Sequence, residues 1–327
     1  MEIKLEVPLG AKELYFLRNK LKILSIDESI DTVERAGAGN MNMVLRVRTN
    51  HRQLILKQSR PYVNKYPEIP APFHRMSIEK AFYDTLLTDN RLVEMTPSLI
   101  AFDDEHQVLA MEDLGPSADF AAIYQTPSLL RRSDIEPLAV FLKRLHAVSA
   151  EAFPTNEAMK LLNHAHIFEI PFMLENGLNL DQVQPGLEEI SLPYRKDTIL
   201  KDQIRTTGNR YLQQGRTLLH GDFYPGSWLK TADGIRIIDT EFAFMGDREF
   251  DLGVALAHLK LAGVDQDLLN YFLEVYDTVG IDDTLMHRYA GIEILRRLFG
   301  VAQLPLHLTL EKKQVLAQEA KNNILHA

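Results

Sequence analysis

Three acidic residues in one short stretch have a spacing that suits phosphoryl-transfer chemistry. Asp222 ends the string His220-Gly221-Asp222, and Asp239 and Glu241 follow further along the same stretch. A carboxylate in a tight loop can orient a hydroxyl group and accept its proton. Two carboxylates separated by one residue can hold a magnesium ion, which binds hard oxygen ligands together with nucleotide phosphates. Asp222 is therefore the candidate catalytic residue, and Asp239 and Glu241 are candidate metal ligands.

The residues between these acids predict a hairpin that brings them together. Residues 227–230 form a short apolar run, residues 231–234 suit a turn that ends in glycine, and residues 235–238 have strand character. Taken singly, each acid is more simply an ordinary turn or strand-end residue, because aspartate commonly caps turns. The complete ordered set favours the catalytic interpretation.

Composition excludes several other classes of protein. The chain has 327 residues, of which 46% are hydrophobic, and this is enough for two lobes with a core each. The absence of cysteine excludes disulfides, thiolate zinc sites and a cysteine nucleophile. A net charge of −9 argues against a nucleic-acid partner. No apolar run has membrane-spanning length and no signal-peptide pattern is present, so we expect no membrane partner and a cytoplasmic location.

A glycine-rich segment near the start of the chain is a candidate phosphate-binding loop. Gly37, Gly39, Asn40 and Asn42 lie between residues of strand character. Glycine lets the backbone approach a phosphate closely and expose N–H groups to it. A glycine pair also makes an ordinary hairpin, so this segment alone decides little.

A lysine after this loop strengthens the nucleotide interpretation. Lys57 ends the apolar run 54–57, and Glu79 opens a predicted helix over residues 78–87. In kinases a lysine at this place pairs with the nucleotide phosphates and with a glutamate of the next helix. The alternative is a solvated lysine at a strand end. The preceding glycine loop and the following glutamate favour the functional interpretation.

A boundary between two lobes is predicted near Glu112. Four prolines in residues 59–77 indicate an extended connection rather than a long helix, and residues 97–102 and 107–111 read as a hairpin. The string Glu112-Asp113-Leu114 then forms the connector, whose backbone groups would bind adenine. A plain strand-to-helix loop remains the alternative. The predicted domains are residues 1–112, binding the nucleotide, and residues 113–327, carrying the catalytic and acceptor-binding groups.

The second lobe reads as mainly helical. Apolar residues recur at helical spacing over residues 137–148, and the chain from Asp251 onward is dominated by helical patterns. His146 is expected to pack or to cap its helix. Asp251 is expected to cap a helix and to brace the backbone of the His-Gly-Asp loop. Arg296 and Arg297 form a pair that is usually solvated, but that could bind an oxygen or phosphate ligand if it faced the site.

With these motifs in place, the chain resembles the aminoglycoside-phosphotransferase/choline-kinase superfamily, most closely its methylthioribose kinase branch. The loop at residues 220–227 is similar to the superfamily string HGDLHPGN, and Ser227 stands where the final asparagine binds metal. Asp239-Thr240-Glu241 stands at the position of the protein-kinase DFG motif. Residues 39–42, 56–63 and 293–302 resemble the branch's GNxN, KQ–PYV and arginine-pair segments.

The resemblance implies an α+β, two-lobed protein-kinase-like fold, with an antiparallel sheet and a helix in the N-lobe and a mainly helical C-lobe. It implies ATP and Mg²⁺ as cofactors, Ser227 as a further metal ligand, and Asp222, Arg296 and Arg297 as residues that bind the acceptor. The expected activity is transfer of the γ-phosphate to a hydroxyl of a small, sugar-like molecule, with methylthioribose as the leading candidate.

Two other functions stay open. The acceptor could be an aminoglycoside, choline or another small alcohol, although cationic acceptors usually need an acidic pocket and an arginine pair argues against one. The chain could also be a nucleotide-binding pseudokinase, although the catalytic aspartate, the lysine and both metal acids are present. The branch's usual Leu-His-Thr is replaced by Phe223-Tyr224-Pro225, which could shape the acceptor pocket. Homodimerisation stays open.

Overall fold

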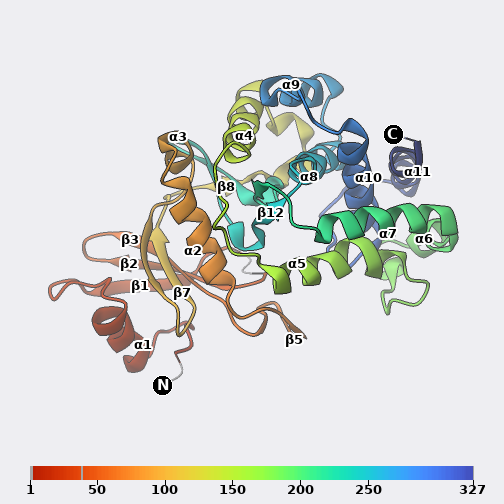
Figure 1. Cartoon of the computed structure of the whole chain (residues 1–327). Coiled ribbons are helices and arrows are strands. Elements are labelled where there is room, and N and C mark those ends of the chain that lie inside the picture. The colour runs from red at the N-terminus through yellow and green to blue at the C-terminus, as the bar shows by residue number, and fades with distance from the viewer. Residues whose placement is uncertain (1–2, 38–39, 327) are drawn as a thin grey trace. The chain divides into compact units, whose positions relative to one another are not determined.

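The computed structural model describes residues 3–37 and 40–326, which divide into two compact units (Figure 1). The first unit consists of Met1–Ala118 and Lys230–Ala243. The second consists of Asp119–Leu229 and Phe244–Ala327. The predicted domains 1–112 and 113–327 differ from these units in two ways. The first unit extends beyond residue 112 to Ala118, and the chain returns to it at residues 230–243.

Local contacts explain both differences. Asp113 follows the last sheet strand and stays in the first unit because its carboxylate binds Arg46 of that sheet, with an Nε–Oδ2 distance of 2.7 Å. The returning segment belongs to the first unit because the Ile237 backbone N–H donates to the Met95 carbonyl at 2.8 Å. Neither contact could be predicted from a shift in composition along the chain.

The first unit is built on a five-stranded antiparallel sheet. The strand order is β1–β2–β3–β7–β6. The strands are β1 (Ile30–Arg35), β2 (Met43–Thr49), β3 (Gln53–Gln58), β6 (Leu99–Asp103) and β7 (Val108–Glu112). Alternate residues of β2 are buried, as expected for a strand with one face on a core. Leu45, Val47 and Leu56 pack there with Phe16 and Leu17 of the amino-terminal segment.

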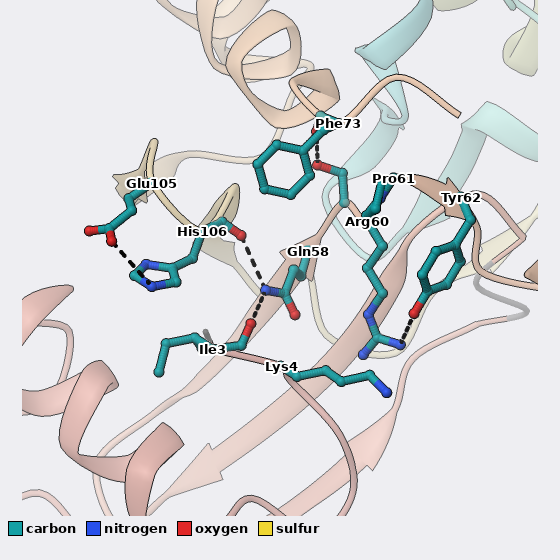
Figure 2. Close-up of a pocket in the computed structure, with 10 residues that line it drawn as sticks. Ile3, Lys4, Gln58, Arg60, Pro61, Tyr62, Phe73, Glu105 and His106 are labelled. Atoms are coloured by element: carbon teal, nitrogen blue, oxygen red, sulfur yellow. Dashed lines mark hydrogen bonds and ion pairs between the residues drawn. The ribbon is translucent and has the colours of Figure 1, made fainter. Parts of the chain in front are cut away.

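Gln58, the residue after Lys57, holds the amino-terminal segment on this sheet (Figure 2). Its side-chain amide donates to the Ile3 carbonyl at 2.9 Å and its oxygen accepts from the Leu5 N–H at 2.8 Å. Arg60 donates to the Leu5 carbonyl at 2.8 Å. Ile3, Gln58 and Arg60 line a pocket with a volume of about 270 Å³. Gln58, the glutamine of the predicted KQ pair, thus has a structural role, because its side chain joins the end of β3 to the amino-terminal segment.

Short elements complete the first unit. They are α1 (Ala11–Tyr15), α2 (Arg75–Leu86), α3 (Asn90–Glu94), the hairpin β4 (Tyr62–Val63) and β5 (Tyr66–Pro70), and the returning strand β11 (Gly234–Ile237). The proline-rich connection therefore contains a small hairpin. Glu79 was expected to open its helix, but α2 begins at Arg75, so Glu79 lies one turn inside.

The predicted hairpin between the acidic groups is present. It consists of β10 (Trp228–Thr231) and β11, which lie within one residue of the predicted runs. Gly234 has a φ of +113°, a backbone conformation that L-residues with side chains rarely adopt, so the turn requires glycine there. Local turn chemistry was sufficient to predict this element. That the hairpin brings Asp239 near Asp222 stays a prediction.

The second unit is mainly helical. Its helices are α4 (Arg132–Leu145), α5 (Glu157–His164), α6 (Leu187–Lys196), α7 (Thr198–Leu212), α8 (Glu249–Leu261), α9 (Gln266–Tyr276), α10 (Asp283–Phe299) and α11 (Leu310–His326). Two short strands, β9 (Thr217–Leu219) and β12 (Phe244–Gly246), pair antiparallel, and β8 (Ala118–Asp119) lies where the chain enters this unit. Within residues 3–37 and 40–326, no helix is both long enough and apolar enough to cross a membrane.

Helix α8 is the core helix of the second unit. Almost every residue from Glu249 to Leu261 is buried, so the helix is enclosed on all sides rather than amphipathic. Asp251 was expected to cap this helix, but α8 begins at Glu249 and Asp251 lies inside its first turn. Helix α4 likewise begins at Arg132, five residues before the predicted start, and carries Pro137 within its first turns.

Gly253 lets α8 and α10 approach closely, and its replacement provides a test of this packing. A methyl group added at Gly253 would lie 2.7 Å from the Tyr289 Cβ and 2.9 Å from the Met286 carbonyl oxygen. Because the oxygen belongs to helix backbone, it cannot move aside easily. We expect Gly253→Ala to lower the free energy of unfolding by about 1–3 kcal/mol, the usual cost of overpacking. Urea unfolding measures this change.

Helix propensity predicts the opposite sign for this substitution, because alanine is favoured over glycine by about 1 kcal/mol within a helix. A Gly253→Ala variant that is more stable than the wild type would therefore contradict the close approach of the two helices.

Candidate active site

The first unit carries a buried lysine between two carboxylates. Lys57 Nζ lies 2.8 Å from Glu79 Oε1 and 2.7 Å from Asp239 Oδ1. Burial alone would lower the pKa of Lys57, but the charges of Asp239 and Glu79 outweigh it and raise that pKa well above its usual value. Lys57 is therefore a fixed cation. The structure brings Lys57, predicted to bind nucleotide, together with Glu79 and with the candidate metal ligand Asp239. With Glu241, the second candidate metal ligand, we call these four residues the nucleotide half-site. Nucleotide and metal binding by them stays a prediction.

The two predicted metal acids have different surroundings. Asp239 is in the left-handed conformation, with φ of +63°, and its side chain is 48% exposed. Glu241 is buried, and burial raises its pKa to about 7 against the opposing charges of Arg75 and Lys57. Asp239 is therefore the carboxylate that solvent and ligands can reach, while Glu241 is held inside the unit.

Arg75 holds Glu241 and was not predicted from the sequence. Its Nε donates to Glu241 Oε2 at 2.9 Å, and its Nη2 donates to Asn42 Oδ1 at 2.8 Å. It also donates to the backbone carbonyls of Met41, Arg60 and Pro72. The planar guanidinium can serve these directions at once, which a lysine could not do. Its place in the first turn of α2, one turn before Glu79, was the only sequence signal for it.

The candidate phosphate loop is partly described. Gly37 has a φ of +68° with open space around its Cα, while the predicted Gly39 lies outside the described residues. The Asn40 carbonyl accepts from the Lys65 N–H at 3.0 Å. Asn42 is buried and its amide donates to Glu241 Oε1 at 2.9 Å. Asn42 thus ties the loop to a candidate metal acid. Phosphate binding by this loop stays a prediction.

The connector residues are fixed by their side chains. The Glu112 carboxylate accepts from the Ser98 N–H at 3.0 Å, and Asp113 accepts from Arg46 and from the Gly115 N–H. Leu114 is half-buried beside them. Such contacts would hold the backbone of the connector in one conformation. Adenine binding by Glu112, Asp113 and Leu114 stays a prediction.

The acids of the nucleotide half-site suit magnesium. Among the described residues, no group of three or more His, Cys, Asp or Glu side chains has the arrangement of a self-contained metal site. Magnesium, however, is usually held by one or two carboxylates and completed by water and phosphate oxygens. Asp239 is an accessible carboxylate of that kind. Both oxygens of the buried Glu241 accept hydrogen bonds from Asn42 and Arg75, so Glu241 would have to exchange these partners to bind a cation. Metal binding by the two acids stays a prediction.

The second unit carries Asp222 in a braced loop. Asp251 is fully buried and accepts hydrogen bonds from the His220 N–H at 2.7 Å and the Gly221 N–H at 3.0 Å. His146, the C-terminal cap of α4, lies 3.3 Å from the same carboxylate. The predicted bracing of the loop by Asp251 and the capping by His146 are both confirmed. These contacts fix the backbone from which the Asp222 side chain projects.

Ser227 also braces this loop. Its hydroxyl is fully buried, lies 2.7 Å from the Asp222 carbonyl and 3.0 Å from the Tyr224 carbonyl, and accepts from the Tyr224 N–H at 3.3 Å. A hydroxyl with these partners closes the turn after Asp222, the candidate catalytic residue. The metal role expected for Ser227 stays a prediction, and the contacts in the structure give it a local structural role.

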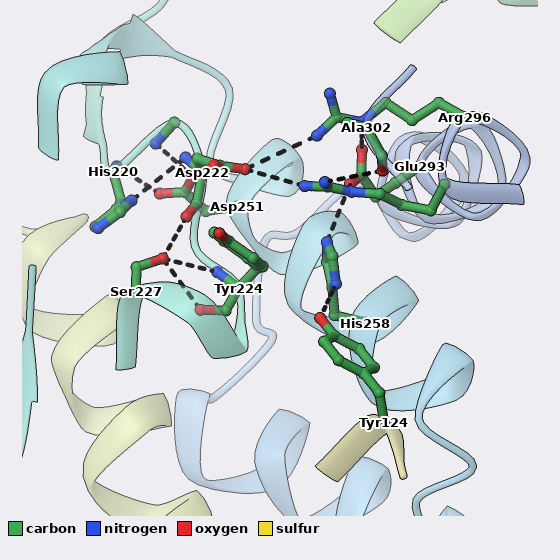
Figure 3. A network of polar contacts seen from close by, with 12 residues as sticks. Tyr124, His220, Asp222, Tyr224, Ser227, Asp251, His258, Glu293, Arg296 and Ala302 are labelled. Carbon is green, nitrogen blue, oxygen red and sulfur yellow. Dashed lines mark hydrogen bonds and ion pairs between the residues drawn. The ribbon is translucent and has the colours of Figure 1, made fainter. Parts of the chain in front are cut away.

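Arg296 faces Asp222 rather than solvent (Figure 3), and the neighbouring Arg297 is likewise buried against Asp222. The terminal nitrogens of Arg297 and Arg296 lie 3.4 and 3.8 Å from Asp222 Oδ1. Burial raises the pKa of Asp222, while the two arginines oppose this rise. The second unit thus holds a candidate acceptor half-site, by which we mean Asp222, Arg296 and Arg297, and acceptor binding by them stays a prediction. The sequence predicted all three residues, but it could not predict whether the arginine pair faces Asp222 or solvent.

The residues that depart from the branch pattern have separate roles. Phe223 is fully buried and packs between Phe141 and Trp228, with ring centroids 5.9 and 5.2 Å away. The Tyr224 ring lies 5.2 Å from the Arg297 guanidinium. Phe223 is therefore a core residue, and Tyr224 is the member of the string that touches the acceptor half-site.

Arg75 can be tested through its buried partner. Arg75→Gln would leave the Glu241 carboxylate without its compensating charge, and breaking one partner of a buried ion pair costs about 3–5 kcal/mol. We expect that loss in the free energy of unfolding, measured by urea denaturation. Arg91→Gln is the matched control, because the Arg91–Glu94 pair is exposed and contributes only about 0–1 kcal/mol. Equal losses in both variants would contradict the role of Arg75.

Asp251 can be tested by an isosteric change. In the wild type, Asp251 accepts hydrogen bonds from two backbone N–H groups. In Asp251→Asn, the side-chain NH₂ would face one of these N–H groups, which would lose its acceptor. Losing a hydrogen bond to a charged group costs about 1.5–3 kcal/mol. We expect this destabilisation in thermal unfolding. Asp202→Asn, at an exposed ion pair of the same unit, should change stability by less than about 1 kcal/mol. Faster hydrogen exchange at the Gly221 amide should accompany the Asp251 change, and unchanged exchange would argue against the brace.

Sequence comparison finds relatives over most of the chain. Residues 32–284 match the model of the phosphotransferase enzyme family. A methylthioribose kinase of Yersinia pseudotuberculosis is 30% identical over 255 residues, which are 72% of this chain and 60% of that protein. Methylthioribose kinase 1 of Oryza sativa is 26% identical over 256 residues, which are 72% of this chain and 57% of that protein. The chain therefore spans about 60% of the length of these curated relatives.

Solved structures share the fold. Choline kinase LicA from Streptococcus pneumoniae superposes with a TM-score of 0.55 at 16% identity, covering 91% of this chain and 95% of that one. A spectinomycin phosphotransferase in complex with ADP and spectinomycin gives a TM-score of 0.54 at 14% identity and 98% coverage of both chains. The expected α+β, protein-kinase-like fold is confirmed. Because the family model matches residues 32–284, the chain belongs to the phosphotransferase enzyme family.

Proposed function

We propose that this protein is an ATP- and Mg²⁺-dependent kinase that phosphorylates a hydroxyl group of a small, neutral, sugar-like acceptor. The observation that carries the proposal is the buried arginine pair that faces Asp222. Family membership supports phosphotransfer, and the neighbouring structures bound to ADP or AMP support an adenine nucleotide. The methylthioribose kinases among the relatives make methylthioribose the leading acceptor.

Lys57 would bind the nucleotide phosphates. Its pairing with Glu79 at 2.8 Å keeps its ammonium group in a fixed position. The present contact with Asp239 would be shared with phosphate oxygens when the nucleotide binds. Asp239 and Glu241 would hold Mg²⁺, which supplies positive charge to the phosphates. Such an arrangement accelerates transfer by positioning and by electrostatic stabilisation.

Asp222 would orient the acceptor hydroxyl and take its proton. Burial raises the pKa of this carboxyl, which makes it a better proton acceptor than an ordinary exposed aspartate. The loop contacts from Asp251 and Ser227 keep the carboxylate in one place. A fixed base of this kind suits a mechanism in which the hydroxyl attacks in line with the phosphate.

The charge balance at the acceptor half-site favours a neutral acceptor. Two buried guanidinium groups accompany Asp222 and the nearby buried carboxylate of Glu293, so the four side chains sum to zero. A cationic aminoglycoside or choline would meet no excess of negative charge there and would approach two arginines. The hydroxyls of a sugar could instead accept hydrogen bonds from the terminal guanidinium nitrogens.

Steady-state kinetics on an acceptor panel test this proposal. We expect ATP-dependent turnover with methylthioribose, weaker turnover with ribose, and none with choline or kanamycin. Asp222→Asn should lower kcat by a factor on the order of 10²–10⁴, because it removes the base while keeping the shape of the side chain. Calorimetry should give nearly unchanged nucleotide affinity for this variant.

Two results would contradict the proposal in different ways. Turnover of a cationic acceptor without turnover of a sugar would keep the kinase activity and reject the acceptor class. Nucleotide binding without phosphorylation of any acceptor would indicate a pseudokinase.

A further inference from the structure

Glu293 joins the two arginines of the acceptor half-site. Arg296 Nε donates to Glu293 Oε2 at 2.6 Å, and Arg297 Nε donates to Glu293 Oε1 at 2.7 Å (Figure 3). The three residues lie three and four positions apart on α10, so they share one face of the helix. Each carboxylate oxygen therefore holds one arginine by its Nε, and the Nη2 of each arginine is the nitrogen near Asp222. Arg297 Nη1 donates to the Ala302 carbonyl at 3.4 Å.

The arginines approach Asp222 without forming a tight ion pair. Their terminal nitrogens are 3.4 and 3.8 Å from Asp222 Oδ1, whereas a charge-assisted hydrogen bond is usually about 2.7–2.9 Å long. The contacts with Glu293 do have such short lengths. Glu293 is thus the principal ionic partner of both arginines. Asp222 lies within their field but remains able to accept a hydrogen bond from another group.

A buried histidine contacts Glu293, and a tyrosine holds that histidine. His258 Nε2 lies 3.0 Å from Glu293 Oε1, and the Tyr124 hydroxyl contacts His258 Nδ1. Burial and the charge of Arg297 lower the pKa of His258 to about 4, so its ring is neutral at physiological pH. We assign the proton to Nε2, which donates to the carboxylate, so that Nδ1 accepts from Tyr124. Glu293 therefore accepts three hydrogen bonds and has little freedom to rotate.

Charge compensation makes this arrangement a requirement. Glu293, Arg296 and Arg297 are each at least 94% buried. Burial would raise the pKa of Glu293, but the two arginines outweigh it and hold that pKa well below its usual value. Without Glu293, two buried cations would face the single carboxylate of Asp222. They would be expected to close on Asp222 and to occupy the oxygens that the acceptor hydroxyl needs.

We propose that Glu293 is a positioning residue that holds Arg296 and Arg297 away from a tight ion pair with Asp222. The inference rests on the proposed phosphotransfer function. The activity would depend on Glu293 although Glu293 itself does not contact the reacting atoms. Tyr124 and His258 complete the support by fixing the orientation of the Glu293 carboxylate.

Kinetics of Glu293→Gln with ATP and methylthioribose test the proposal. The glutamine keeps the shape of the side chain but loses its charge, and its amide group opposes one arginine Nε–H. We expect kcat to fall about 10- to 100-fold, as for loss of a hydrogen bond between charged groups. Nucleotide affinity, measured by calorimetry, should stay within about twofold. Glu249→Gln is the matched control, because this buried carboxylate of α8 contacts the Asp282 backbone and should leave kcat unchanged.

A double variant separates positioning from a purely structural role. Arg296→Gln alone should lower kcat. In the Glu293→Gln background it should leave kcat unchanged or raise it, because removing one guanidinium restores the balance of charge. If the two losses multiply, or if Glu293→Gln has the wild-type kcat, the proposal is wrong. Should Glu293→Gln fail to fold, Glu293→Asp decides: it keeps the charge but reaches only one arginine, so its kcat should fall and its nucleotide affinity should not.

The inference and the proposed function fail in distinguishable ways. A wild-type protein that phosphorylates no acceptor would contradict the proposed function. In that case ¹⁵N NMR of the arginine Nε–H groups still tests the contact with Glu293. We expect two Nε–H signals protected from exchange in the wild type and loss of that protection in Glu293→Gln. Unprotected signals in the wild type would overturn the inference.

Discussion

The ion pair between Lys57 and Glu79 lies inside the first unit, where an unpaired charge would cost several kcal/mol. This constraint determines much of the structure around it. Lys57 has to emerge from a sheet strand at the level of Glu79 on α2, and the Tyr83 hydroxyl donates to the same glutamate at 3.2 Å. Asp239, whose own side chain is half-exposed, also contacts the lysine at 2.7 Å. The sheet, the helix and the returning hairpin strand are thus held in positions that keep these charges paired.

The same constraint applies to the rest of the candidate site. Arg75 compensates Glu241 in the first unit, and Glu293 compensates Arg296 and Arg297 in the second. In each case a buried charge of the proposed site is accompanied by a buried opposite charge. Removing one partner would expose the other to an environment that cannot solvate it. The proposed site therefore includes residues, such as Arg75 and Glu293, whose proposed task is to compensate charge rather than to bind a substrate.

The chain shares its fold with known proteins, but some side chains near Asp222 are features of this chain. The phosphotransferase fold also serves the choline kinase and spectinomycin phosphotransferase to which this chain is similar, so the fold alone does not select an acceptor. The particular features lie on α10 and in the loop after Asp222. There Tyr224 lies against Arg297, and a methyl group added at Gly226 would meet the Tyr224 ring, so the glycine allows the tyrosine to take this position. Because these two segments carry the proposed acceptor half-site, we expect the acceptor choice of this protein to depend on them.

Contiguous residues were sufficient to predict several elements. The His-Gly-Asp loop, the hairpin with Gly234 in its turn, the Lys57 strand and the helix of Glu79 could be predicted because turn chemistry, periodicity and motif spacing act over short distances. Bracing of the loop by Asp251 could also be predicted, since it followed from the motif that the chain resembles. Helix starts were less accurate. Both α2 and α4 begin before their predicted residues, because periodicity marks the middle of a helix better than its ends.

The tertiary structure decided which polar residues compensate which. Nothing in the sequence pairs Arg75 with Glu241, or Tyr124 with His258, because these partners are 166 and 134 residues apart. Only packing shows that Ser227 is buried within its own loop and that the arginine pair faces Asp222 instead of solvent. The physical reason is that motif spacing identifies the groups that can do chemistry, whereas the pairing of buried charges depends on which helix and sheet faces meet when the chain folds.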